Sequence, residues 1–420
     1  MRSAPSRPHR QAEEGGGDFA QRRARPARRR QQPRRHGNSA GPPIARAPPA
    51  TVVTSARPGA VSMTAGQAGR RRERRRRRRS PPSRMYRKEK SILLKESSLA
   101  LYNNMSVLPL PAKQLTYFAS VHGTTVNMVS ASDDGLSFSH RQLQAKEGSL
   151  GVGASIITQA AWCVLPSRVL LVLTSRKGIQ MYESDGSIMV YWHALEGLES
   201  PPGKAVFARG IAATGQRFVC VGTSLGSVLI FDVPAKGTNI TLSEVLEKHC
   251  DSITDIAAEL CEQPEGVPDL VTADDSGALC VWFSGEKFTL ANKIPASECT
   301  CSSVKLWNGI IAAGYGNGHI RLYEAASGIL RAEVRAHARW IYALDLAPLS
   351  GKLLSAAEDS FVQVWKLSPS PDSEGIEIQH CHSECVTDTM ICGARFCNPE
   401  GSAFAVTGFE LSEIIHYVLA

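Results

Sequence analysis

The chain has 420 residues, of which 48 are Lys or Arg and 39 are Asp or Glu, giving a formal net charge of +9. The charge is unevenly distributed. Residues 1–84 contain 23 Arg, no Lys and four acidic residues, whereas residues 85–420 contain 25 basic and 35 acidic residues. A mildly acidic body of this size argues against a nucleic-acid-binding face built into the fold.

The sequence shows neither a secretory signal peptide nor a membrane-spanning segment. The first residues, MRSAPSRPHRQ, lack the apolar core of a secretory signal peptide. The 11 cysteines are therefore expected to be reduced and mostly buried, in an intracellular compartment. The longest apolar stretch, residues 160–174, is interrupted by Pro166 and Arg168 and is too short to span a bilayer. These features predict a soluble, cytoplasmic protein.

Residues 1–84 form a segment of their own, rich in Arg, Pro, Ala and Gly. With so few large apolar side chains the segment cannot bury a core, so we expect it to be disordered. One interpretation is an extension without a dedicated role, since ordinary composition returns at Met85. The alternatives are an Arg-rich arm that binds nucleic acid or directs the protein to the nucleus, and a mitochondrial presequence.

A repeat begins after Met85. Five segments share a short apolar run, a tight polar turn and alternating apolar residues that end in an aromatic residue, and successive aromatic positions are spaced by 49, 51, 41 and 42. Alternation with a period of two predicts strands, and glycines in the turns predict hairpins. The five segments are VLLVLTSRKGIQMY, FVCVGTSLGSVLIF, LVTADDSGALCVW, IIAAGYGNGHIRLY and LLSAAEDSFVQVW.

This repeat length, with four strands per unit, is typical of β-propeller blades. The units resemble the WD-repeat family. Trp282 and Trp365 occupy the position of the family's tryptophan, and Phe231-Asp232 and Tyr323-Glu324 resemble degenerate WD dipeptides. The resemblance implies a seven-bladed WD40-type β-propeller over residues 85–420, with no chemistry of its own and with other proteins as partners.

The resemblance also implies a buried hydrogen-bond tetrad in the sixth unit. His337, Ser355, Asp359 and Trp365 follow one another in the family's order. Because an unsatisfied buried polar group costs about 1–3 kcal/mol, such residues must satisfy one another. We therefore interpret this His, Ser and Asp as structural and not as a hydrolase triad.

The fourth unit departs from the pattern. His249, Thr272 and Trp282 match, but Ser276 stands where the family has its aspartate. Two aspartates, at 274 and 275, come just before it, and a shifted turn would present Asp275. We take Asp275 as the fourth member of this tetrad.

Two further units complete a ring of seven. Residues 99–144 contain four apolar segments separated by turns, whereas residues 391–420 supply only three. The missing strand is available in residues 91–95. A propeller that pairs this segment with its C-terminal blade leaves no open edge to act as an aggregation template.

Two short motifs mimic catalytic or metal sites. Residues 222–226 match the G-x-S-x-G nucleophile elbow around Ser224, but a period-two strand follows where a hydrolase needs a helix. A second cluster offers thiols and imidazoles, which suit zinc, although it lacks the paired C-x2-C of a zinc module. Its residues, which we interpret as a polar loop, are His380, Cys381, His382 and Cys385.

Arg339 and Trp340 follow His337, where WD-type propellers turn onto a face that often binds partners. Arg and Trp are enriched in binding hot spots, although packing of the indole within the blade is equally consistent with its position. Taken together, the residues predict a non-catalytic protein-interaction scaffold that binds other proteins, without a cofactor or small-molecule substrate and with self-association possible. The alternative is association with nucleic acid or chromatin through residues 1–84.

Overall fold

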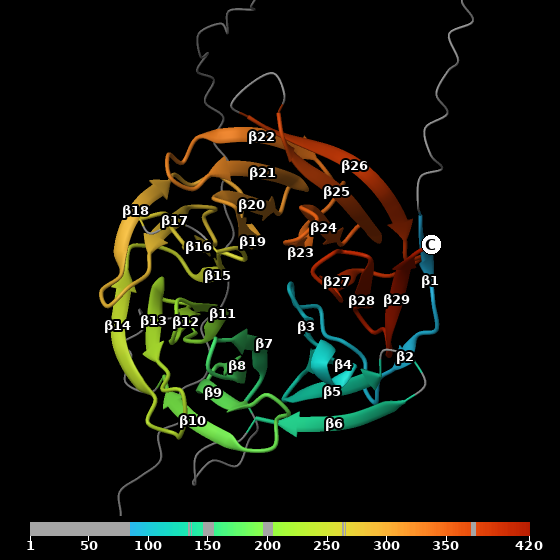
Figure 1. The fold of residues 1–420 in the computed structure, drawn as a ribbon, viewed down its shortest axis with the longest axis horizontal. Coiled ribbons are helices and arrows are strands. Elements are labelled where there is room, and N and C mark those ends of the chain that lie inside the picture. Colours follow the sequence, from blue (N-terminus) through green and yellow to red (C-terminus); the bar gives the residue numbers. More distant parts are fainter. Residues whose placement is uncertain are drawn as a thin grey trace, which may run out of the picture. The chain divides into compact units, whose positions relative to one another are not determined.

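The computed structural model describes residues 85–132, 135, 137–145, 155–195, 205–262, 264, 266–370 and 375–420, all of which belong to one structural unit. Seven sheets surround a common axis, as in Figure 1. Within these ranges, no helix is long and apolar enough to cross a membrane. Residues 1–84, on which the predictions of disorder and nucleic-acid binding rest, lie outside the described part of the chain.

Each sheet forms one blade, numbered 1 to 7 here, with its first strand nearest the axis and its last strand at the rim. Blade 1 also carries a short 3₁₀-helix, η1 (Pro111–Lys113). The first three blades contain β3 (Ser106–Leu110), β4 (Leu115–His122), β5 (Thr125–Ser132) and β6 (Phe138–Gln144); β7 (Ile157–Val164), β8 (Val169–Ser175), β9 (Gly178–Glu183) and β10 (Met189–Ala194); β11 (Ala208–Thr214), β12 (Phe218–Thr223), β13 (Ser227–Asp232) and β14 (Thr241–Glu247).

The next three blades repeat this order. They contain β15 (Ile253–Ala258), β16 (Leu270–Asp274), β17 (Leu279–Phe283) and β18 (Thr289–Ile294); β19 (Cys301–Trp307), β20 (Ile310–Tyr315), β21 (His319–Glu324) and β22 (Leu330–Arg335); β23 (Ile341–Ala347), β24 (Lys352–Ala357), β25 (Phe361–Pro369) and β26 (Ile376–Cys385). The seven-bladed WD40-type propeller predicted from the repeat is confirmed.

Blade 7 closes the ring with strands from both ends of the propeller. Its C-terminal strands are β27 (Ile391–Phe396), β28 (Ala403–Gly408) and β29 (Glu413–Leu419). The outer strand is split into β1 (Tyr86–Lys88) and β2 (Ile92–Leu93), both antiparallel to β29. Closure through residues 91–95 is confirmed for Ile92 and Leu93. The additional strand at Tyr86 was missed, because only one of its three residues is buried.

Burial explains the sequence pattern of the blades. The second strand of a blade lies between neighbouring sheets, so β12 is buried along its whole length and reads as a continuous apolar run. The outer strand faces solvent, so β14 is mostly exposed and polar. Between blades 2 and 3, Val172, Met181 and Val219 belong to one buried cluster. Similar apolar layers between the sheets hold the ring together.

The strand directions define two faces. The connection face carries the turns between second and third strands and the links between blades, for example residues 316–318, 336–340 and 94–105. The opposite face carries the remaining turns, for example residues 308–309 and 348–351. These two names are used below in this sense.

Candidate functional site

Blade 6 contains a buried chain of hydrogen bonds among four side chains. Trp365 Nε1 donates to Ser355 Oγ over 3.0 Å, and that oxygen lies 2.8 Å from His337 Nε2. His337 Nδ1 lies 3.1 Å from Asp359 Oδ1. Because the indole N–H can only donate, the Ser355 hydroxyl gives its own hydrogen to Nε2, and Nδ1 donates to the carboxylate. The structure thus brings together all four residues predicted for this blade.

This network is closed to solvent at its centre. The side chain of His337 and the whole of Ser355 have 0% exposure. Burial raises the pKa of Asp359, but the hydrogen bond and charge of His337, together with the backbone N–H groups of Ala338 and Phe361, outweigh it, and the pKa falls below its ordinary value. A serine hydroxyl without exposed surface cannot reach a substrate, so the set stabilises the blade.

Blade 4 contains the same arrangement with one difference from the prediction. Trp282 Nε1 donates to Thr272 Oγ1 over 3.0 Å, and His249 Nε2 lies 2.7 Å from that oxygen. His249 Nδ1 bonds to Asp274 at 2.7 Å. The prediction of Asp275 is wrong: its carboxylate lies outside this network and accepts a hydrogen bond from Thr300.

The position at which β16 ends explains why Asp274, and not Asp275, joins this network. Asp274 is the last residue of that strand and is 1% exposed, so it points into the sheet interior toward His249. Ser276 donates to Asp274 Oδ1 over 2.6 Å, and the backbone N–H of Ala278 donates to the same oxygen. Burial raises the pKa of Asp274, but the hydrogen bond and charge of His249, together with the hydrogen bonds of Ser276 and Ala278, outweigh it, so the pKa lies below its ordinary value.

Ser224, at the centre of the G-x-S-x-G motif, lies in the turn between β12 and β13. It is 4% exposed. Its hydroxyl donates to the carbonyl of Ala205, and its oxygen accepts the backbone N–H of Phe207. The strand-turn-strand geometry lacks the helix on which a nucleophile elbow depends.

The interpretation of the His and Cys residues considered for zinc as a polar loop is wrong: they lie on β26, the outer strand of blade 6, which pairs with β25. An outer strand faces solvent and can be polar, so its sequence resembles that of a loop. His380 Nε2 donates a hydrogen bond to Gln363 Oε1 and its ring packs on Trp365, while the His382 ring packs on Tyr86. Cys381 and Cys385 are both exposed. Across the described ranges, no three His, Cys, Asp or Glu side chains converge as metal ligands.

Arg339 and Trp340 lie on the connection face, in the link between β22 and β23. Arg339 is exposed, and Trp340 retains 38% of its surface. The indole stands over the neighbouring blade 5, where a Cβ atom added to Gly316 would lie 2.8 Å from the ring. Only glycine therefore fits beneath it, and the indole forms a fixed, half-exposed platform between two blades.

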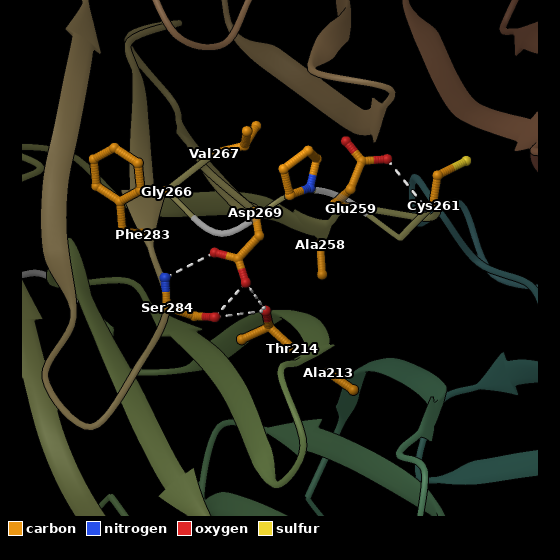
Figure 2. A pocket seen from close by; sticks show the side chains of 11 residues that line it. Ala213, Thr214, Ala258, Glu259, Cys261, Gly266, Val267, Asp269, Phe283 and Ser284 are labelled. Carbon is orange, nitrogen blue, oxygen red and sulfur yellow. Dashed lines mark hydrogen bonds between the residues drawn. The ribbon is translucent and has the colours of Figure 1, made fainter.

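A cavity of about 690 Å³ opens between blades 3 and 4 at the opposite face (Figure 2). Asp269 accepts hydrogen bonds from Thr214 Oγ1 and from the backbone and hydroxyl of Ser284. Glu259 accepts backbone N–H groups, including that of Cys261. Burial and the charge of Glu259 raise the pKa of the Cys261 thiol, which keeps it protonated and weakly nucleophilic. The sequence did not indicate this cavity, because its lining comes from separate strands of two blades.

A second cavity, of about 530 Å³, lies at the closure between blades 7 and 1. Its lining includes Ile92, Phe118, Phe138 and Val418. No run of the sequence signals it either, since residues from both ends of the propeller form its walls.

Comparison with known proteins agrees with this architecture. The family model described as WDR54 matches residues 85–419. The chain belongs to the WDR54 family. Segments such as VFARGIAATG and ARFCNPEGSAFAVTG resemble WD repeat-containing protein 54 in the sequence, and the family match confirms that resemblance.

Relatives within this family cover the propeller. WD repeat-containing protein 54 of Mus musculus is 59% identical over 333 residues, which is 79% of this chain and 99% of that protein. The Homo sapiens protein of the same name is 60% identical over 330 residues, 79% of this chain and 98% of that protein.

Two solved structures share the fold. A chain of the mitotic checkpoint complex has a TM-score of 0.59 at 15% identity and covers 81% of this chain and 98% of its own length. The WD40 β-propeller domain of Doa1 has a TM-score of 0.55 at 13% identity and covers 79% of this chain and 96% of its own length. At these identities the similarity concerns the fold alone.

Proposed function

We propose that this propeller is a non-catalytic protein-interaction scaffold whose partners bind the connection face over blades 5 to 7. The observation that carries the proposal is Trp340. Its indole is fixed over Gly316 and 38% exposed, so it offers a large apolar surface without an entropy cost for ordering it. Rigid aromatic anchors of this kind dominate protein–protein hot spots.

Two further exposed aromatic side chains lie on the connection face and support the proposal. Phe361 begins β25 directly after the turn 358–360 and is 38% exposed. Phe409 follows β28 and is 40% exposed. Together with Trp340 they give the connection face aromatic surface from two adjacent blades. A protein partner, which buries apolar area at the centre of its interface, suits such a surface.

The charges around Phe361 and Phe409 favour a basic partner. Asp388 and Glu410, in the links and turns of blades 6 and 7, are exposed, and Glu358 is half-exposed beside the turn that leads to Phe361. Complementary charge around an apolar centre accelerates association and rejects other partners. We therefore infer a partner segment that combines an apolar anchor with Lys or Arg.

The proposed absence of catalysis has support at the two sites that resemble catalytic sets. The tetrads are enclosed within their blades, and Ser224 is bonded on both sides to the backbone of residues 205–207. A nucleophile needs both an adjacent base and access to substrate. Neither arrangement offers both.

The test compares three forms of the full-length chain as bait in quantitative affinity capture: wild type, Trp340→Ala and Leu349→Ala. Leu349 lies on the opposite face with 73% exposure and serves as the matched apolar control. We expect Trp340→Ala to lose specific partners at least tenfold and Leu349→Ala to retain them. Equal recovery by all three forms would show that the connection face is not the binding surface. Circular dichroism of both variants checks that they are folded.

A further inference from the structure

The link between blades 7 and 1 crosses the connection face from the rim to the centre. Residues 94–105 join β2 at the rim to β3 at the axis, and in Figure 1 the chain leading into β3 enters the middle of the ring. Asn103 and Asn104, at its inner end, are 2% and 3% exposed. This link therefore fills the space where the central channel opens on that face.

Asn103 hydrogen-bonds to the inner strands of two blades, β23 and β19. Its backbone N–H donates to the carbonyl of Tyr342 in blade 6 over 2.7 Å, and its Nδ2 donates to the carbonyl of Ser302 in blade 5 over 3.2 Å. Ser303 Oγ lies 3.0 Å from its Oδ1. The residue has a φ of +53°, which Asn tolerates better than most side chains. The backbone N–H of Asn104 donates to Cys392 in blade 7, so these two residues touch three blades.

Tyr102 bridges opposite sides of the ring. The guanidinium of Arg209, in blade 3, donates to the Tyr102 carbonyl and stacks over its ring, with Cζ 3.4 Å from the ring centroid. On the other side, the Tyr102 ring lies 6.3 Å from the ring of Tyr342 in blade 6. Blades 3 and 6 are not neighbours in the ring, and Tyr102 contacts both of them.

The contact with Arg209 is weak for a buried charge. Arg209 is 5% exposed, its Nε has no hydrogen-bond partner, and no carboxylate of the described residues lies within ion-pair distance. A buried cation without an anion bears a desolvation penalty that one carbonyl and one aromatic face offset only in part. Arg209 itself lies in β11, whose backbone is held in the sheet of blade 3, whereas residues 101–104 belong to no strand. The link is therefore the side of this contact that can move away.

We propose that Leu101–Asn104 is a displaceable plug of the central channel and that the contact between Arg209 and Tyr102 is its latch. In the closed state, the plug covers the axis and leaves only the rim of the connection face to partners. When it opens, the guanidinium of Arg209 and the carbonyls of Ser302 and Tyr342 become accessible. This inference does not depend on the function proposed for Trp340.

Hydrogen–deuterium exchange of the full-length chain tests the plug. In the wild type we expect the amides of residues 101–104, although buried, to exchange at least tenfold faster than those of β12. Arg209→Ala should raise the rate of residues 101–104 at least tenfold further and leave β12 unchanged. Exchange of residues 101–104 only together with β12 in the wild type would overturn the proposal, since the plug would then open only on global unfolding.

Arg217→Ala is the matched control. Arg217 belongs to the same blade and lies over the ring of Phe218, with Cζ 5.3 Å from the ring centroid, but does not touch the plug. Its loss should leave residues 101–104 unchanged; an equal effect of both arginines would contradict the latch. If Arg209→Ala does not fold, Asn103→Gly keeps the positive φ and removes the side-chain contacts to blade 5. That variant should also accelerate exchange and expose the bond after Tyr102 to chymotrypsin, whereas resistance to both would refute the plug.

Discussion

Trp365→Ala measures how strongly the tetrad stabilises the propeller. The indole is 6% exposed, packs edge-on against His380 with ring centroids 5.1 Å apart, and donates to Ser355. Truncation of a buried tryptophan to alanine costs about 3–5 kcal/mol, because apolar contacts are lost and a cavity remains. Trp365→Phe keeps an aromatic ring and removes mainly the N–H donor, which should cost about 1 kcal/mol.

Scanning calorimetry of the full-length chain gives the readout. At about 2 °C per kcal/mol for a domain of this size, Trp365→Ala should lower the Tm by about 6–10 °C and Trp365→Phe by about 2 °C. Leu349→Ala, on the opposite face and 73% exposed, is the control and should change the Tm by less than about 1 °C, since surface substitutions are usually near neutral. A melt of Trp365→Ala within one degree of wild type would refute the burial argument. Equal losses for Ala and Phe would show that the hydrogen bond, and not packing, dominates.

Three further outcomes follow from the tetrads and turns. Asp274→Asn should destabilise the chain by about 2–3 kcal/mol in urea unfolding, whereas Asp275→Asn should stay within about 0.5 kcal/mol; the reverse order would contradict the corrected assignment. The folded-state pKa of Asp359 is depressed, so the stabilisation by its carboxylate is complete above the unfolded carboxyl pKa of about 3.9 and is lost as the pH falls below that value. Wild type and Asp359→Asn should therefore converge in stability near pH 2. A constant difference in stability across that range would count against the pKa shift. Gly318→Ala should lower the free energy of unfolding by more than about 3 kcal/mol, because a Cβ there would lie 2.1 Å from a backbone carbonyl. Gly237→Ala has a similar φ but open space around the Cβ, so it should cost about 1–2 kcal/mol. Equal losses of stability would show that φ alone decides the cost.

The repeat could be predicted because each blade needs the same local pattern. A second strand enclosed by two neighbouring sheets must be mostly apolar, and the third strand must alternate before its aromatic residue, so the five central units are visible in the sequence. The tetrad of blade 6 could be predicted for the same reason. His337, Ser355 and Trp365 stand at the family's spacing, and the turn before Phe361 has the ordinary length.

The predictions failed where the sequence pattern does not determine at which residue a strand begins or ends. Asp274 and Asp275 are chemically identical, and only the end of β16 decides which carboxylate enters the sheet. The outer strand of blade 7 is split between Tyr86 and Ile92, and its polar first part follows no apolar alternation. Its pairing depends on β29, more than 320 residues away in the chain, and not on its own composition.

The plug shows a further limit of reading sequence alone. Asn103 and Ser303 are separated by 200 residues, and Tyr102 and Arg209 by 107, so no short motif contains both members of either pair. In isolation, Asn103-Asn104 predicts only a turn. Once the ring closes, however, the first inner strand must begin beside the axis, and whatever precedes it lies over the channel. The closed ring explains why two buried asparagines and a buried arginine without a carboxylate lie together. These polar groups meet only when the ring is closed. The structure at the mouth of the channel therefore depends on the same closure that holds blade 7 together.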